Sequence, residues 1–192
     1  RDEQDLFALN SQEKTQKATN ENRFKNELIK LKINTDDKNF IFEKDEHPRN
    51  NLNLEDLKKL KTVFKENGTV TAGNSSGIND GAAATILMSR EEAELRGIEP
   101  LAKVVSWATC GVEPSLMGLG PIKAVNLALE KAEWTREDVD LFEINEAFAA
   151  QSIAVIRDLK IRKEIVNVNG GAIALGHPIG ASGTRILVTL IH

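Results

Sequence analysis

The sequence predicts a layered α/β fold that begins with a charge-rich segment of a different character. From about residue 80 onward, short apolar runs alternate with stretches of helical period. Such alternation with short connections is typical of helices packed on a sheet. The first 75 residues are instead rich in charged and turn-forming side chains. We therefore expect them to form an excursion that packs on the sheet.

The excursion is predicted to open with a surface helix and a pair of strands. Residues 2–18 are mostly polar with a few apolar points, which indicates a helix with only a weak apolar stripe. Residues 28–33 then alternate apolar side chains with lysines, and a second apolar run lies at 40–42. The intervening residues 34–37 are typical of a turn, so we expect the two runs to pair as strands.

Two further helices are indicated by apolar spacing and by capping residues. Leu54, Leu57, Leu60 and Phe64 fall on one side of a helix that Gly68 ends. Residues 89–92 form a capping-box pattern, in which a serine side chain and a glutamate satisfy the first backbone amides, and Gly97 closes the short helix that follows.

The remainder is predicted to alternate strands with helices. The elements that we expect are strands at 83–88, 101–107, 139–144 and 165–168, and helices at 121–132, at about 147–159 and from about 182 onward.

Composition and charge exclude several classes of function. The chain has 25 Lys+Arg against 29 Asp+Glu and no basic stripe, so we expect no nucleic-acid partner. Apolar runs such as 86–88 and 186–188 are far too short to cross a bilayer, so we expect no membrane partner. The single cysteine, Cys110, excludes an intrachain disulfide and fits a reducing compartment. We expect a cytoplasmic protein, with an organelle as the alternative.

Two segments combine small and polar residues next to predicted strands. Residues 71–81 hold glycines and short hydroxyl side chains, so a ligand can approach the backbone closely, but a simple hydrogen-bonded turn has the same composition. Residues 145–148, NEAF, follow an apolar strand at the edge of the sheet where ligands usually bind. Asn145 is equally favourable as a helix cap without any function.

The third unusual segment is a long glycine-rich loop at residues 167–183. It follows a strand, carries His177 between Gly176 and Pro178, and leads into a helix. A helix N-terminus offers amide donors to an anion, and histidine exchanges protons near neutral pH. A lone histidine is usually structural, but we favour function in this loop. The patterns of dinucleotide and P-loop sites are absent from it.

Taken together, these segments resemble the signature blocks of the thiolase family. The blocks are NEAF at 145–148, GAIALGHPIGASG at 171–183, TVTAGN at 69–74 and MGLGP at 117–121. The resemblance runs through essentially the whole chain and is nearest to the biosynthetic acetyl-CoA acetyltransferase branch. It implies a partial thiolase-like α/β fold with helices on mixed sheets. It also implies three parts, which are part of a CoA-binding α+β loop domain at 1–78, the last strand and helix of the N-terminal domain at 79–97, and a C-terminal domain without its final segment at 98–192.

The resemblance also implies roles for individual residues. His177 corresponds to the histidine that activates the nucleophile and helps form an oxyanion hole, and Asn145 to the residue that holds a water in the enolate oxyanion hole. The residues expected to contact coenzyme A or the acyl group are Ser76, Ala72, Phe64, Arg49, Met117, Ala147 and Phe148. Coenzyme A is part of the substrate, so no separate cofactor and no metal is implied.

Two departures from the family concern its catalytic cysteines. The nucleophilic cysteine of the family lies upstream of the residues present, and the second one would follow shortly after His192. Cys110 matches no catalytic block, and we interpret it as a small packing residue. A Claisen enzyme without nucleophile and base cannot turn over. We therefore interpret the chain as a fragment and expect it to be inactive alone.

Three functional hypotheses remain open from the sequence. The first is an acetyltransferase that joins two acetyl-CoA to acetoacetyl-CoA, or runs in reverse, and acts as a homodimer or homotetramer when intact. The second is a degradative 3-ketoacyl-CoA thiolase for longer chains, although Met117 near the acyl pocket favours short substrates. The third is a non-catalytic CoA-binding module. The presence or absence of the cysteines in the full gene separates the enzymes from the module.

Overall fold

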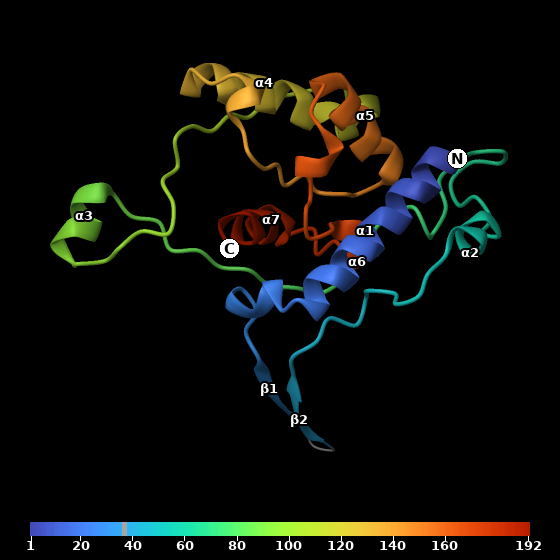
Figure 1. Cartoon of the computed structure of the whole chain (residues 1–192), viewed down its shortest axis with the longest axis horizontal. Helices are drawn as coiled ribbons and strands as arrows, with labels where there is room; N and C mark the ends of the chain where they lie inside the picture. Colours follow the sequence, from blue (N-terminus) through green and yellow to red (C-terminus); the bar gives the residue numbers. More distant parts are fainter. Residues whose placement is uncertain (36–37) are drawn as a thin grey trace.

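A computed structural model describes residues 1–35 and 38–192. Figure 1 shows helix α1 (Asp2–Asn20) crossing the middle of the molecule, with the short helix α6 (Ala172–Leu175) beside it. Helices α4 (Gly120–Ala132) and α5 (Ala149–Leu159) form one end of the molecule, and a hairpin projects from the other. Helix α3 (Arg90–Leu95) lies apart from the other helices, at the left of Figure 1, and two long extended segments connect it to the rest of the molecule.

Helix α1 was predicted correctly, but its predicted place on the surface is wrong. Its buried face includes Asp5, Ser11 and Thr15 beside Ala8. The helix packs against α2 (Leu54–Lys58), α5 and α6. Because this buried face is polar and hydrogen-bonded, it leaves no strong apolar stripe in the sequence.

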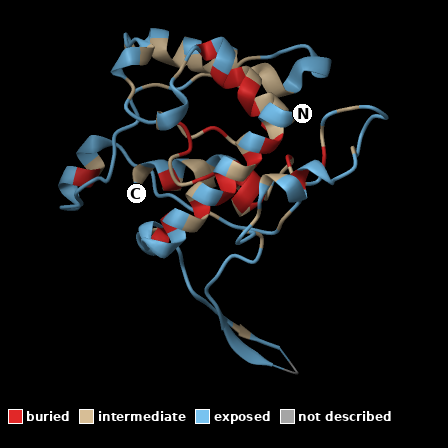
Figure 2. Ribbon diagram, turned by 45° about the vertical axis from the view of Figure 1, so that its right-hand side comes forward, coloured by how far each residue is buried: buried red, intermediate tan, exposed pale blue. Residues whose placement is uncertain are grey.

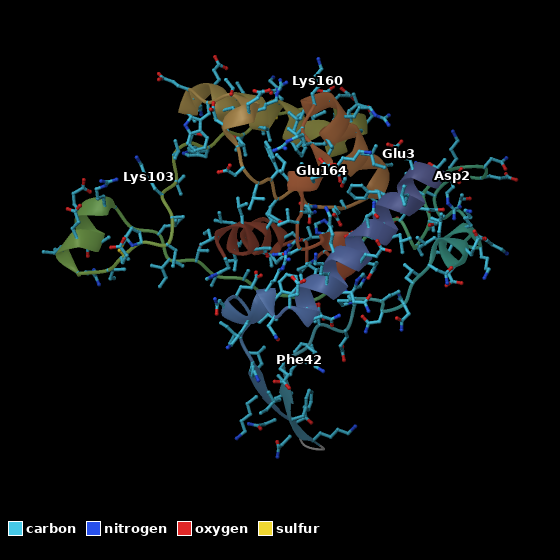
Figure 3. The ribbon with its side chains drawn as sticks, in the orientation of Figure 1. Asp2, Glu3, Phe42, Lys103, Lys160 and Glu164 are labelled. Carbon is cyan, nitrogen blue, oxygen red and sulfur yellow. The ribbon has the colours of Figure 1, made fainter. Side chains whose placement is uncertain are left out.

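The predicted hairpin is confirmed as an antiparallel pair of strands, β1 (Leu31–Asn34) and β2 (Asn39–Phe42). Leu31 lies opposite Phe42, and Ile33 lies opposite Phe40. The predicted turn at 34–37 includes residues 36–37, which lie outside the described residues. Figure 3 shows the side chains of the hairpin, Phe42 among them, standing clear of the rest of the molecule.

The helix predicted from Leu54 to Gly68 is much shorter than expected. Only α2 is helical, capped by the Asn53 side chain, which accepts from the Asp56 amide. Of the apolar side chains that suggested the helix, Leu57 is buried, whereas Phe64 is 71% exposed. A helix in a protein is stabilised mainly by packing of its apolar face. The chain is therefore not helical beyond α2, where its apolar side chains are no longer buried.

The other predicted helices are confirmed. They are α3, capped by Ser89, then α4, α5 and α7 (Ser182–Ile191). The sequence did not indicate α6, nor the 3₁₀ turns η1 (Arg23–Asn26), η2 (Pro114–Leu119), η3 (Arg136–Asp138) and η4 (Lys163–Ile165). Within the described residues, no helix is both long enough and apolar enough to cross a membrane.

The four strands predicted after residue 80 are not formed within the described residues. At 139–144 and 165–168 there is one parallel bridge, between Phe142 and Val166. The segments at 83–88 and 101–107 pair with nothing described, and Ile86 is 88% exposed. A strand exists only where a neighbouring backbone accepts and donates its hydrogen bonds, and none of the described residues provides such a neighbour there.

The core lies between α1, α5 and the loops that enter and leave them, where the buried residues of Figure 2 gather. One apolar cluster consists of Ile144, Val155, Ile156, Leu159 and Val166. A second cluster joins helices that are far apart in sequence and consists of Ala8, Leu57, Ala149 and Ile173.

A fully buried carboxylate connects these clusters. Glu146 accepts hydrogen bonds from Ser11 Oγ (2.6 Å), Asn167 Nδ2 (2.8 Å) and the Ile173 amide (3.3 Å). Its carboxylate lies directly over Gly171, where a methyl group would come within 2.2 Å of the carboxyl carbon. Only glycine fits at this position. The carboxylate therefore joins α1 to the glycine-rich loop through buried donors.

Replacement of Glu146 should destabilise the protein strongly. Glu146→Ala leaves the Ser11 hydroxyl and the Ile173 amide buried without an acceptor, and each such group costs about 1–3 kcal/mol, whereas Asn167 Nδ2 keeps the Ile144 carbonyl as a partner. We expect the free energy of unfolding, measured with urea, to fall by at least about 2 kcal/mol. The exposed Glu164 provides the control, since Glu164→Ala should change it by less than about 0.5 kcal/mol. Equal effects of the two variants would contradict the role of the buried carboxylate.

Candidate functional site

The three unusual sequence segments meet in the structure. The amide and the hydroxyl of Ser76 both donate to the Ala147 carbonyl, at 3.1 and 3.0 Å. The Ala149 amide donates to the Asn74 carbonyl at 2.9 Å, and Ser75 forms a bridge with Phe148. The segment at 71–81 is therefore bound along the residues that lead into α5.

The glycine-rich loop lies against the same segment. The His177 amide donates to the Gly77 carbonyl and to Asn79 Oδ1, both at 3.2 Å, and His177 bridges with Ile78. Gly176 has a φ of +96°, and a methyl group there would lie 2.6 Å from the Asn79 side chain. Both the backbone angle and the close approach require glycine at this position. The backbone of His177 is thus fixed from one side by the 71–81 segment.

The imidazole of His177 is oriented by Ser182 at the start of α7. Nδ1 of the ring lies 2.6 Å from Ser182 Oγ, and that hydroxyl donates to the Pro178 carbonyl at 3.0 Å. A hydroxyl has one proton, so Ser182 Oγ must accept from His177, and Nδ1 is the nitrogen that carries a hydrogen. Nε2 of the neutral ring is then left with its lone pair, as a general base requires.

Asn145 lies beside this ring and is nearly equidistant from its two nitrogens. Its Nδ2 lies 3.3 Å from Nε2 and 3.4 Å from Nδ1 of His177. Its Oδ1 is buried and has no hydrogen-bond partner among the described residues. A hollow of about 390 Å³ is lined by residues 79–83 and 178–181, which follow the site residues in the chain, but not by His177 or Asn145 themselves. Two polar groups, one of them incompletely satisfied, therefore lie together next to the segments that line a hollow.

The remaining predicted contact residues lie at different distances from this centre. Phe64 packs edge-to-face on Phe148, with ring centroids 5.8 Å apart. Ala72 is exposed, and the Arg49 amide donates to Gln12 Oε1 on α1. Met117 is 76% exposed on η2, which packs on α5. The structure thus brings together Phe64, Ser76, Ala147 and Phe148. Among the described residues, no side-chain hydrogen bond or aromatic pair joins Ala72, Arg49 or Met117 to them.

A second carboxylate next to the site is held in an unfavourable environment. The side chain of Glu143 is almost fully buried, and its ion pair with Arg185 is loose, at 3.8 Å. Burial raises the pKa of Glu143 to about 7, and the charges of Glu146 and Glu27 act in the same direction. The positive charges of Arg185 and Lys14 oppose the rise. Burial likewise raises the pKa of Glu146 and lowers that of Lys14.

The raised pKa of Glu143 should make folding stability depend on pH. The folded protein binds a proton more tightly at this group than the unfolded chain, whose ordinary pKa is 4.5. Its contribution is therefore fully present below pH 4.5 and is lost as the pH rises through about 7. Relative to Glu143→Gln, the wild type should lose about 3 kcal/mol of unfolding free energy across this range. Urea titrations at a series of pH values measure the difference, and parallel curves for the two proteins would contradict the assignment.

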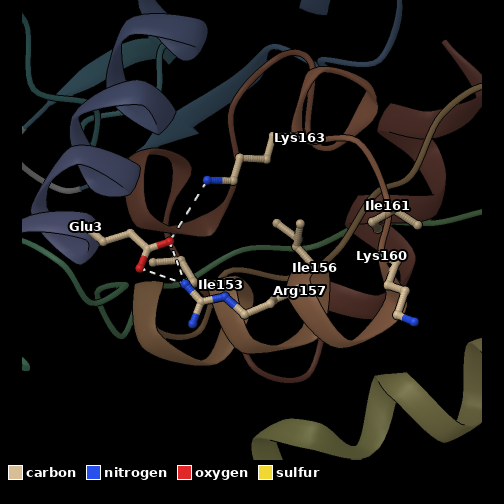
Figure 4. A pocket seen from close by; sticks show the side chains of 7 residues that line it. All are labelled: Glu3, Ile153, Ile156, Arg157, Lys160, Ile161 and Lys163. Carbon is tan, nitrogen blue, oxygen red and sulfur yellow. Dashed lines mark hydrogen bonds and ion pairs between the residues drawn. The ribbon is translucent and has the colours of Figure 1, made fainter.

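Another hollow, of about 310 Å³, lies away from His177 between α1 and the end of α5 (Figure 4). Arg157 is paired there with both carboxylate oxygens of Glu3 at 2.9 Å, and Lys163 is 3.9 Å from the same carboxylate. None of the side chains that line this hollow has a buried polar atom without a hydrogen-bond partner, in contrast to Asn145 at the site of His177. No cluster of three metal-binding side chains is present among the described residues.

Sequence reasoning did not identify Ser182 and Asn79 as parts of the site. Ser182 is the first residue of α7, where a serine is usually interpreted as part of a helix start, and Asn79 lies in a segment typical of turns. Their spacing from His177 is the only available signal, and it becomes informative only when the loop conformation is known. Cys110 lies elsewhere, with Sγ donating to the Gly120 carbonyl at 3.3 Å at the start of α4.

Two protein-domain families match the chain. The family described as "Thiolase, N-terminal domain" matches residues 1–91, and the family described as "Thiolase, C-terminal domain" matches residues 98–192. Together they account for nearly the whole chain.

Curated relatives include the acetyl-CoA acetyltransferases of Shinella zoogloeoides, 54% identical over 191 residues, and of Syntrophomonas wolfei, 57% identical over 194 residues. Each alignment covers 100% of this chain and 49% of the relative. The chain therefore spans about half the length of the curated relatives it matches.

Solved structures give the same result. The acetyl-CoA acetyltransferase of Bacillus anthracis superimposes with a TM-score of 0.98 at 48% identity, and the human mitochondrial 3-ketoacyl-CoA thiolase with 0.93 at 43%. Both superpositions cover 100% of this chain and 49% of the other. The fold class predicted from the sequence is confirmed. Within the described residues, the strands expected after residue 80 are linked to one another only by the bridge between Phe142 and Val166.

Proposed function

Because the chain belongs to the thiolase family, we propose that the whole protein is an acyltransferase that joins two acetyl-CoA to acetoacetyl-CoA and CoA, or catalyses the reverse reaction. The observation that carries this proposal is the contact of Asn145 Nδ2 with the imidazole of His177, 3.3 Å from Nε2 and 3.4 Å from Nδ1, where the three unusual segments meet. The names of the relatives support the choice of acetyl-CoA as substrate.

In this proposal, His177 serves first as a base and then as a hydrogen-bond donor. With its Nδ1 hydrogen directed at Ser182, its Nε2 takes the proton of a nucleophilic thiol. The thiolate attacks the thioester carbon, and negative charge develops on the former carbonyl oxygen. The protonated Nε2 can then donate to that oxygen, and Asn145 contributes a second donor directly or through a water.

The thiol itself is not provided by the described site. Cys110 is engaged with the Gly120 carbonyl, outside the group of residues around His177. We therefore propose that both catalytic cysteines come from parts of the protein beyond these 192 residues, and that this chain alone does not turn over.

The coenzyme A moiety is proposed to lie along the 71–81 segment, with no cofactor besides the substrate. Ser76 and Ala147 are joined there by two hydrogen bonds, and the Phe64–Phe148 pair provides an apolar wall next to them. We propose Ala72, Arg49 and Met117 as further contacts of coenzyme A or the acyl group. We also propose that the chain is divided into domains at residues 78 and 97, and that the whole protein is a homodimer or homotetramer.

A second candidate is a thiolase for longer acyl chains. The superposition with the human mitochondrial 3-ketoacyl-CoA thiolase favours it, since that enzyme also covers the whole chain. Activity profiles of the full-length protein across acyl chain lengths distinguish the two. We expect acetoacetyl-CoA to be the preferred substrate.

Loss of the His177 imidazole should reduce turnover far more than substrate affinity. His177→Ala removes an interaction made chiefly in the transition state, so kcat and kcat/KM fall together. Removal of one oxyanion donor costs about a hundred- to a thousandfold, and loss of thiolate activation should add to it. Asn145→Ala should cost less if a water partly replaces the amide.

Steady-state thiolysis of acetoacetyl-CoA by the full-length protein measures these effects, with Cys110→Ala as the control that stays near the wild-type rate. If His177→Ala retained most of its kcat but lost thermal stability and affinity for CoA, the histidine would only support the loop, and the proposed function would be wrong.

A further inference from the structure

His47 contacts both loops of the site without belonging to either. It lies in the connection between β2 and α2 and is partly buried. Its Nδ1 is 2.9 Å from the carbonyl oxygen of Ala174, which can only accept. Nδ1 must therefore carry the hydrogen and donate it to this carbonyl, three residues before His177.

The other edge of the same ring lies on the 71–81 segment. A methyl group added at Gly77 would lie 2.5 Å from Nε2 and 3.0 Å from Cδ2 of His47. The absence of a side chain at Gly77 is what allows the ring to reach the backbone. The carbonyl of the same Gly77 accepts from the His177 amide at 3.2 Å.

The ring of His47 therefore connects the glycine-rich loop and the 71–81 segment, which also contact each other directly. From His47 the contacts pass through Ala174 along the glycine-rich loop to His177, and from His177 through its amide to Gly77 and back to His47. The position of the His177 backbone relative to the 71–81 segment depends on both branches. Without the His47 side chain, the contacts to Ala174 and Gly77 are lost, and the glycine-rich loop can then shift against the 71–81 segment.

We propose that His47 is a positioning residue of the site, which fixes the distance between the glycine-rich loop and the 71–81 segment by donating to Ala174 and packing on Gly77. The proposal rests on the proposed function, because it assigns to the 71–81 segment the bound acyl-CoA and to the loop the catalytic His177. His47 itself contacts no reacting atom in this assignment.

A simple filling of space by the ring is the competing interpretation. An isosteric pair of variants separates the two, because Asn and Leu have similar size, whereas only Asn retains a donor near the position of Nδ1. His47→Asn should keep the hydrogen bond to Ala174, and His47→Leu should lose it while still covering Gly77.

The first measurement is the steady-state kinetics of the full-length protein in thiolysis of acetoacetyl-CoA. We expect His47→Leu to lower kcat by about ten- to a hundredfold, the range that a small misplacement of catalytic groups produces. His47→Asn and the exposed neighbour control Glu46→Ala should stay close to wild type. Equal kcat values for His47→Asn and His47→Leu would overturn the proposal. An inactive wild type would instead contradict the proposed function.

The second measurement tests the contact with Gly77 through thermal unfolding and does not depend on activity. Gly77→Ala should lower the Tm less in a His47→Ala background than in the wild type. The new methyl group meets His47 Nε2 at 2.5 Å and Asn79 Oδ1 at 2.8 Å, and only the contact with Asn79 remains when the ring is removed. Gly81→Ala is the matched control, since its methyl group would meet Pro178 at 2.8 Å and not His47. Its effect should be the same in both backgrounds. An equal loss of Tm for Gly77→Ala in both backgrounds would overturn the contact.

Discussion

The buried carboxylate of Glu146 is the constraint on which the rest of this structure depends. It accepts from α1 through Ser11, from Asn167 and from the start of α6, with all three donors inside the core. A buried charge is tolerated only with such a full set of partners. Each lost hydrogen bond leaves part of the free-energy cost of removing the charge from water uncompensated. The carboxylate therefore fixes α1, the end of the 139–144 segment and the glycine-rich loop in one arrangement.

The site follows from this arrangement through short lengths of chain. Asn145 directly precedes Glu146 in the chain. The Ile173 amide donates to the Glu146 carboxylate, and His177 follows Ile173 after about one turn of chain that includes α6. Ser182 then orients the imidazole from α7, and Asn79 and Gly77 hold its backbone. The ionisable groups around Glu143, namely Glu146, Glu27, Arg185 and Lys14, form a partly buried cluster in which the charges are not fully paired. The site is thus supported by a polar core and not by a purely apolar one.

The sequence predicted those elements whose signals are local, and it was less successful where partners are distant. Ser89 and Asn53 cap helices as their types indicate, and the glycine-rich loop around His177 was identified from its composition. The polar buried face of α1 was misassigned to the surface, because hydrogen bonds to residues more than a hundred positions away leave no periodic pattern. The expected strands at 83–88 and 101–107 have suitable residues, but pairing needs a neighbouring strand, and the part of the chain that the structure describes does not provide one.

The central claim is that His177 and Asn145 form one polar site for the carbonyl oxygen of an acyl-CoA thioester. A crystal structure of the full-length protein with bound acetyl-CoA, its nucleophilic cysteine replaced by alanine, tests this most directly. We expect the thioester oxygen within hydrogen-bond distance of His177 Nε2, with Asn145 or a water held by it as the second partner. A thioester bound away from His177, for example in the hollow of Figure 4 between Glu3 and Lys163, would contradict the claim.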